Sequence, residues 1–258
     1  MILYTNGCSF TWGGSLDHIF CDGNLCKVDE DKRLPILWPH HLGKLLNADS
    51  VVNLSDGCGS NQRIVRTTYN WLRSKTVEEL KETIAVIQLT EWSRFEMYDP
   101  HDIENEWAED PVDWIKCKVD LVTHEYNHYP KSNFNRNRDI LLKKATHTLK
   151  NTHPLEHFYR NIGYMYALQG MFNAFGVKDF YIWNHSHAWH FWPKEHRDAI
   201  FNTFKVLDEV HDWEKFRWSD DYWVYDRVSK NDWHPSVHGH IELANVIHDR
   251  MKRKGYRG

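Results

Sequence analysis

Met1-Ile2-Leu3-Tyr4-Thr5-Asn6-Gly7-Cys8-Ser9-Phe10 opens the chain. An apolar strand, Ile2–Tyr4, runs directly into a turn that carries a glycine and Ser9. In α/β proteins, functional side chains gather at the carboxyl ends of parallel strands, on the turns that follow them. Ser9 is therefore a candidate nucleophile, and it needs a base because a serine hydroxyl reacts poorly at neutral pH.

The opposite end of the chain offers that base. It reads Asn231-Asp232-Trp233-His234-Pro235-Ser236, followed by Gly239-His240 and an apolar helical pattern. An imidazole can take the proton from a serine hydroxyl, and a carboxylate can orient the imidazole. We therefore predict that Ser9, His234 and Asp232 meet at one edge of a sheet as nucleophile, base and orienting acid. An alternative nucleophile is the neighbouring thiol of Cys8.

Strand and helix patterns alternate along most of the chain. This alternation predicts a parallel sheet with helices on both faces. The continuous apolar run Thr83–Leu89 is typical of a central parallel strand. The other expected strands are Ile2–Tyr4, Ser50–Leu54 and Val177–Trp183, and the expected helices are Pro35–Asn47, Gln62–Ser74, Leu155–Phe175, Arg197–Val210 and Gly239–Lys254. The segment Trp218–Tyr225 is ambiguous.

The middle of the chain does not follow this pattern. From about residue 95 to residue 154 the sequence is polar and lacks periodicity. A long aperiodic segment in a compact protein is expected to carry function or short helices of its own. We therefore predict one domain, residues 1–258, with an irregular insertion or lid at about 95–154.

Composition excludes several classes of protein. The chain has 258 residues, 41% of them hydrophobic and 26% charged, which predicts a folded core. A net charge of −4 without a long basic run argues against a nucleic-acid binder. No apolar run reaches the roughly 20 residues that a membrane helix needs. Neither a leader nor a disulfide framework is visible, which predicts reduced cysteines and a soluble cytoplasmic protein.

No metal or other cofactor is expected, although two patterns resemble ligand sets. Cys21 and Cys26 are spaced like zinc ligands, but no second close pair completes four ligands. The run His185-Ser186-His187-Ala188-Trp189-His190 follows a predicted strand and is either a metal site or a surface loop. Gly57 and Gly59 hint at a dinucleotide fingerprint, but residue 62 is Gln where the third glycine belongs.

The turn after the second strand is a candidate oxyanion site. Gly59 lets a backbone N–H approach a substrate oxygen, and the side chain of Asn61 at a helix start can add a second donor. The competing interpretation is an ordinary turn in which the glycine is needed for a positive φ angle.

Four short blocks in this order resemble the SGNH (GDSL-like) hydrolase superfamily. They are Gly7-Cys8-Ser9-Phe10, Gly59-Ser60-Asn61, Gln88-Leu89-Thr90-Glu91 and Asp232-Trp233-His234-Pro235. The first block is most similar to the divergent branch of phages and environmental bacteria. The resemblance covers about residues 1–94 and 155–254. It implies a three-layer, flavodoxin-like sandwich with a central, mostly parallel five-stranded sheet.

The resemblance implies a carboxylic ester hydrolase, an esterase or deacetylase, that forms an acyl-enzyme at Ser9. The backbone N–H of Ser9 then joins Gly59 and Asn61 in the oxyanion hole. Thr90 is the fourth expected oxyanion residue; it stands where the family usually presents Asn, and its hydroxyl can donate in place of the amide. Cys8 stands where many relatives carry Asp. Many relatives also place the acid three residues before the histidine, which here is Asn231, so Asp232 departs from that spacing.

The substrate is expected to be a small-molecule or glycan ester. The aromatic residues around the insertion, Trp92 among them, suit an acylated carbohydrate. Arg94 either binds an anionic part of the substrate or pairs with Glu91. The alternative function is a catalytically silent binding or structural protein of this fold, such as a virion or surface-recognition component. In a phage-encoded protein the virion is then the expected location. The sequence does not predict the oligomeric state.

Overall fold

The computed structural model describes most of the chain outside the middle segment. The described residues are 1–14, 16, 18–21, 24–27, 30–57, 59–90, 94–98, 114–119, 126–129, 147, 154–184, 198, 200, 202–207, 227–229 and 232–257.

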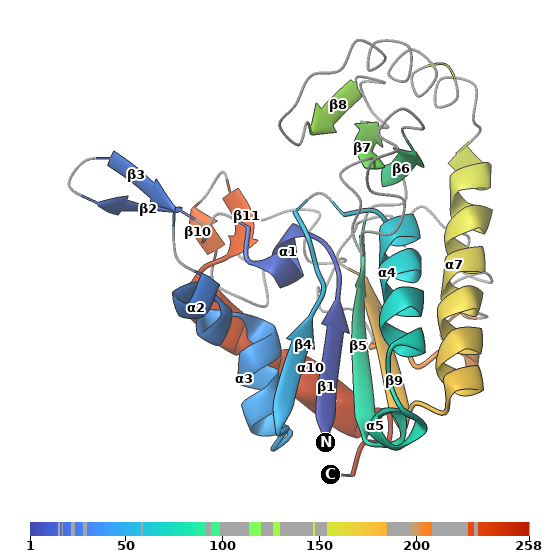
Figure 1. The fold of residues 1–258 in the computed structure, drawn as a ribbon. Helices are drawn as coiled ribbons and strands as arrows, with labels where there is room; N and C mark the ends of the chain where they lie inside the picture. Colours follow the sequence, from blue (N-terminus) through green and yellow to red (C-terminus); the bar gives the residue numbers. More distant parts are fainter. Residues whose placement is uncertain are drawn as a thin grey trace.

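A four-stranded parallel sheet forms the centre of the molecule (Figure 1). Its strand order is β4-β1-β5-β9, with bounds Ser50–Asn53, Ile2–Asn6, Thr83–Leu89 and Asp179–Asn184. All three pairings are parallel. Every residue of β5 is buried, as its mostly apolar sequence predicts. The predicted mixed α/β fold is therefore confirmed.

The fifth strand of the expected sheet stays a prediction. Beyond β9, the described residues show one isolated parallel bridge, between Ile182 and Val206. The amide of Ile182 donates to the carbonyl of Lys205 at 3.1 Å, and the amide of Leu207 donates to that of Ile182 at 2.8 Å. The helix predicted over Arg197–Val210 is therefore wrong at its end. Residues 204–207 leave the helix because β9 needs a backbone partner along its outer edge.

Helices cover both faces of the sheet and bury alternate strand residues. On one face, α4 (Asn61–Arg73) and α7 (Pro154–Phe175) pack against Tyr4, Ala85 and Ile87. On the other face, α3 (Trp38–Leu45) and α10 (Val237–Arg253) pack against Leu3, Ile84 and Val86. Because consecutive strand side chains point to opposite faces, β1 and β5 each supply both cores.

Several helix ends follow signals in the sequence. The Ser60 hydroxyl accepts from the Arg63 amide at 3.1 Å and caps α4, and the Ser236 hydroxyl accepts from the Gly239 amide at 3.0 Å and caps α10. Elements that the sequence did not predict are α1 (Ser9–Trp12), α2 (Glu30–Arg33), a 3-10 helix (Leu34–Ile36), α5 (Val77–Lys81) and the hairpins β2 (His18–Cys21) with β3 (Asn24–Lys27) and β10 (Arg227–Ser229) with β11 (Asp232–Pro235).

Three described stretches of the middle segment form strands, and residue 147 is helical. β6 (Arg94–Tyr98), β7 (Trp114–Val119) and β8 (Tyr126–Tyr129) pair in this order as an antiparallel sheet. The ion pair between Arg66 of α4 and Glu96 of β6, 3.2 Å long, joins this small sheet to the core. The ambiguous segment Trp218–Tyr225 lies outside the described residues.

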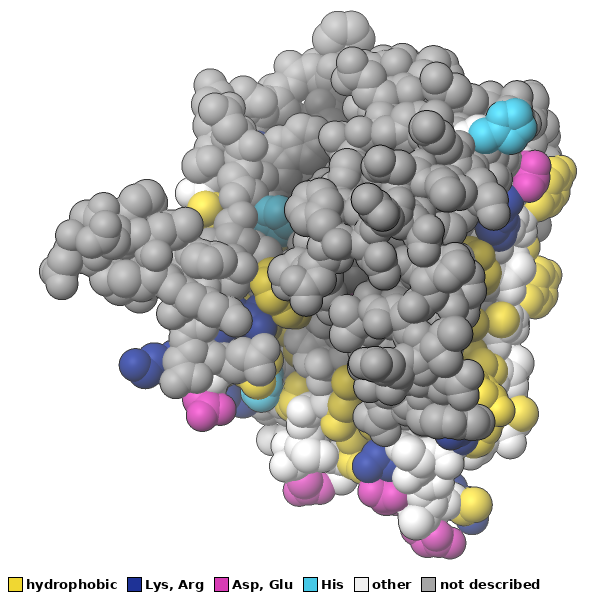
Figure 2. Space-filling view, turned by 45° about the horizontal axis from the view of Figure 1, so that its top comes forward, with side chains coloured by type: hydrophobic (Ala, Val, Ile, Leu, Met, Phe, Trp, Pro, Cys, Tyr) yellow, Lys and Arg dark blue, Asp and Glu magenta, His cyan; other side chains and the backbone are white. Residues whose placement is uncertain are grey.

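The described surface carries both signs of charge. Figure 2 shows basic and acidic side chains interspersed along the lower margin of the molecule. Among the described residues, no helix is both long and apolar enough to cross a membrane.

Candidate active site

The two ends of the chain meet at the carboxyl edge of the sheet. Figure 1 shows α1, which follows β1, beside β11, which precedes α10. Ser9 begins α1 and His234 lies in β11. His234 Nε2 and Ser9 Oγ are 2.9 Å apart, although 225 residues separate them in sequence. This is hydrogen-bond distance, the arrangement that a serine nucleophile and its base require.

The turn that presents Ser9 depends on the absence of a side chain at Gly7. A Cβ atom at Gly7 would lie 2.6 Å from Thr11 Oγ1 and 2.8 Å from both Cβ and Oε1 of Gln88. The Thr11 hydroxyl donates to Gln88 Oε1, so α1 is held against the end of β5. Gly7 therefore lets the turn lie directly on the central strand.

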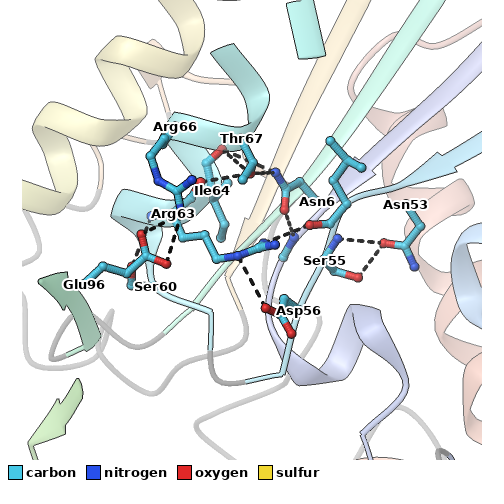
Figure 3. Close-up of polar contacts among 12 residues, drawn as sticks. Asn6, Asn53, Ser55, Asp56, Ser60, Arg63, Ile64, Arg66, Thr67 and Glu96 are labelled. Atoms are coloured by element: carbon cyan, nitrogen blue, oxygen red, sulfur yellow. Dashed lines mark hydrogen bonds and ion pairs between the residues drawn. The ribbon is translucent and has the colours of Figure 1, made fainter. Parts of the chain in front are cut away.

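Asn6 holds the end of β1 against α4 (Figure 3). Its Nδ2 lies 2.8 Å from Thr67 Oγ1 and 3.1 Å from the Tyr4 hydroxyl, and its Oδ1 accepts from the Gly7 amide at 2.9 Å. Asn6 is fully buried. The sequence analysis did not single out Asn6. The only local signal was a polar residue directly before the glycine turn.

The carboxyl end of β4 is held by a second polar group. Arg63 Nη1 donates to the Leu54 carbonyl at 2.9 Å, and Arg63 Nε lies 3.6 Å from Asp56 Oδ2 (Figure 3). The Asp56 amide in turn donates to the Gly7 carbonyl at 3.3 Å. The loops that follow β1 and β4 are thus tied to each other beside Ser9.

Cys8, the alternative nucleophile, is buried in a hydrophobic core. Cys8 is fully buried in the core formed with α3 and α10. A thiol enclosed by hydrophobic side chains meets no substrate, so the geometry favours Ser9 over Cys8 as nucleophile.

For Asp232, the structure describes the backbone. Its backbone lies in β11, the strand that also carries His234, and it pairs with Ser229 of β10. The side chain of Asp232 lies outside the described residues, so the third member of the triad stays a prediction.

The proposed oxyanion donors differ in what they already bind. The Ser9 N–H stands in the first turn of α1, and no acceptor for it occurs among the described residues. The Gly59 N–H donates to the Asp56 carbonyl at 3.1 Å. Gly59 does not adopt a positive φ angle. A Cβ there would lie 3.2 Å from the carbonyl oxygens of Asp56 and Gly7, so this glycine permits close backbone approach rather than an unusual conformation.

Asn61 and Thr90 lie together in a buried clamp. Asn61 Oδ1 accepts from the Thr90 amide at 2.8 Å, and its Nδ2 donates to the Thr90 carbonyl at 3.0 Å. The same Nδ2 donates to Asn161 Oδ1 of α7 at 2.5 Å. Within the described part of the chain, buried Thr90 Oγ1 has no hydrogen-bond partner. Asn161 is a further site-forming residue that the sequence reasoning missed, because it contributes from the middle of a long helix.

The remaining predicted residues are only partly placed. Arg94 is half-buried at the start of β6, and Trp92 and Glu91 lie outside the described residues. The same holds for residues 185–190 and for the side chains of Cys21 and Cys26. Among the residues that the structure describes, no group of three metal-ligating side chains occurs.

A cavity of about 290 Å³ lies between the end of β4 and α4, away from Ser9 and His234. Several of its polar groups are already paired: the Ser55 hydroxyl donates to Asn53, the Thr67 hydroxyl to the Arg63 carbonyl, and the Ser74 hydroxyl to Trp71. The cavity therefore offers few free groups to recognise a ligand. Its lining residues are Asn53, Leu54, Ser55, Arg63, Thr67, Asn70, Trp71 and Ser74.

The fold and this site define a mixed α/β protein with a serine–histidine pair at the carboxyl edge of a parallel sheet. The same fold occurs in a member of the lipolytic protein G-D-S-L family from Veillonella parvula, with a TM-score of 0.50 and 11% identity over 98% of this chain and 99% of that one. The structure of the lipase Lip_vut3 from a goat rumen metagenome has a TM-score of 0.46 to this chain. The two are 12% identical in sequence, over 99% of this chain and 98% of that one.

Sequence comparison adds one family match. Residues 26–148 match a family described as a family of unknown function, DUF6071. The matched range covers part of the central domain and most of the predicted insertion. No curated protein is significantly similar to the chain.

Proposed function

We propose that this protein is a serine hydrolase of the SGNH type that cleaves a carboxylic ester through an acyl-enzyme at Ser9. The observation that carries the proposal is the 2.9 Å separation of Ser9 Oγ and His234 Nε2. Its support from comparison is the fold shared with a lipolytic G-D-S-L protein. Asp232 is proposed to orient the imidazole from the same strand.

In this mechanism, Ser9 Oγ attacks the ester carbonyl carbon while His234 Nε2 accepts the hydroxyl proton. The tetrahedral intermediate then collapses, the bond to the leaving oxygen breaks, and the imidazolium returns the proton to the departing alcohol. In the second half, His234 takes a proton from water as the water oxygen attacks the acyl carbon. The bond between the acyl carbon and Ser9 Oγ then breaks, and the imidazolium returns the proton to Ser9 Oγ. This releases the acid and restores the Ser9 hydroxyl.

The oxyanion is proposed to bind at the start of α1. The Ser9 N–H is favoured as the first donor because it has no acceptor among the described residues. The Thr90 hydroxyl is favoured as the second, since it is buried and no described residue bonds to it. Gly59 N–H and the Asn61 amide can contribute only by exchanging their present bonds to Asp56, Thr90 or Asn161. Loss of one oxyanion donor typically raises the barrier by about 2.7–4 kcal/mol.

The finer parts of the proposal concern the substrate and its setting. An acylated carbohydrate is proposed as the substrate class, with Trp92 and Arg94 beside it and the segment at about 95–154 as a lid. The protein is proposed to belong to the phage and environmental-bacterial branch, which its first block resembles, and to act in the cytoplasm or on a virion.

The test is covalent labelling by a fluorophosphonate probe, combined with hydrolysis of short-chain nitrophenyl esters and acetylated sugars. Wild type should be labelled, and Ser9→Ala should abolish both labelling and hydrolysis. His234→Gln should lower both by several orders of magnitude. Ser74→Ala, the same substitution on an exposed residue at the end of α4, serves as the matched control. A folded wild-type protein that neither reacts nor hydrolyses any of these esters would refute the proposal and favour the binding or structural alternative.

A further inference from the structure

The imidazole of His234 lies against Phe10 and Gly14, two residues that take no part in the proposed catalytic steps. The Phe10 ring lies with its centroid 4.6 Å from that of the imidazole, at an interplanar angle of 31°. On Gly14, a Cβ atom would lie 2.7 Å from His234 Nε2 and 2.8 Å from Cδ2. Real Cβ atoms essentially never approach closer than 3.0 Å. The Gly14 backbone therefore packs directly on the ring edge that faces Ser9.

Gly14 is also tied to the nucleophile. Its amide donates to the Ser9 carbonyl at 2.7 Å, and its Cβ position would lie 3.1 Å from Ser9 Cβ. The return is made possible by Gly13, which ends α1 in the left-handed conformation with φ of 83°. The chain thus turns back after one helical turn and places Gly14 against both members of the pair.

From this geometry we infer that Phe10 and Gly14 form a slot that positions the His234 imidazole for proton transfer, and that Gly14 must lack a side chain for Nε2 to reach Ser9. Phe10 is only 5% exposed, so its ring has little freedom to move away. On the edge of the imidazole beside Gly14, the ring is bounded by backbone atoms, which cannot move aside as a flexible side chain could. Neither residue touches the reacting carbonyl, so both act as positioning residues.

The inference rests on the proposed role of His234, yet it can be tested without enzyme turnover. The measurement is the NMR chemical shifts of the His234 ring nitrogens and protons, at one fixed pH, in protein labelled with ¹⁵N-histidine. His234→Gln assigns the signals. Gly14→Ala should displace the His234 signals, because the methyl group forces Nε2 away from Ser9 Oγ. Gly163→Ala is the matched control, since a Cβ at Gly163 meets nothing within 4 Å.

A second variant covers the case in which Gly14→Ala does not fold. Phe10→Leu keeps a hydrophobic side chain but removes the aromatic ring, so the ring-current shift on the His234 protons should disappear. His234 signals that superimpose in wild type and either folded variant would overturn the inference.

Activity then separates the two proposals. If wild type is labelled by the fluorophosphonate, Gly14→Ala should slow labelling at least tenfold and alter its pH profile, whereas Gly163→Ala should leave both unchanged. If wild type is not labelled but the NMR result holds, the hydrolase proposal fails while the slot is confirmed.

Discussion

Acid should destabilise the protein through His240, a fully buried histidine of α10. Burial, together with the nearby His41 and His234, lowers the pKa of His240 to about 3 from the ordinary value of 6.5. The Trp38 amide donates to His240 Nδ1 at 3.1 Å, so protonation at Nδ1 would also cost this bond. The folded protein therefore keeps this imidazole neutral at pH values where the unfolded chain protonates it.

The sign and size of the effect follow from linkage. Because the pKa of His240 is depressed in the folded protein, the stability that the neutral residue contributes is fully present above about pH 6.5. That stability is lost as the pH falls toward 3. At pH 5 the unfolded chain gains about 2 kcal/mol from protonating this residue, and the full shift corresponds to about 5 kcal/mol. Wild type should thus lose about 2 kcal/mol of unfolding free energy between pH 8 and pH 5 from His240 alone.

Urea unfolding of wild type and His240→Gln at pH 8 and pH 5 measures this loss. Glutamine can still accept from the Trp38 amide but does not titrate, so its pH dependence should be shallower by about 2 kcal/mol over this span. His238→Gln, on the exposed face of the same helix, should behave like wild type. Equal pH slopes for wild type and His240→Gln would refute the reasoning.

Two further predictions concern the elements around the site. Gly7→Ala should lower the unfolding free energy by about 1–3 kcal/mol, because its Cβ would overlap Gln88, whereas Gly170→Ala in open space should stabilise α7 by about 0.5–1 kcal/mol. Thermal unfolding of the pair checks this, and a Gly7→Ala protein as stable as wild type would contradict it. Glu96→Gln should cost about 3 kcal/mol, since it removes the buried negative charge that pairs with Arg66. A double-mutant cycle with Arg66→Gln measures the coupling, and a coupling energy near zero would show that the pair does not anchor β6.

Local sequence was enough for the elements whose residues carry their own signals. The apolar run Thr83–Leu89 coincides with β5, and the serine before Asn61 and the serine before Val237 cap the helices that were expected there. The meeting of Ser9 and His234 was also predictable, because both follow or precede elements whose ends lie at one edge of a parallel sheet. Such signals depend on residues a few positions apart, so they can be read from the chain directly.

Other features were decided only by the tertiary structure. Arg197–Val210 has helical periodicity, yet its end pairs with β9 because an unsatisfied strand edge outweighs a modest helical propensity. The described strands of the middle segment pair with one another. The polar sequence of that segment did not predict these pairings.

The same holds within the site. Gly59 resembled a free oxyanion donor in the sequence, but its amide is bound within its own turn. Asn61 is clamped to Asn161, which lies 100 residues away. In the sequence, Gly14 is only the second of two adjacent glycines. The group that leaves no room for a side chain at this position is His234, which lies near the other end of the chain. Periodicity and short motifs report what a residue prefers among its neighbours in sequence. Which hydrogen bonds are already used, and which atoms leave no room for a side chain, depend on groups that only folding brings together.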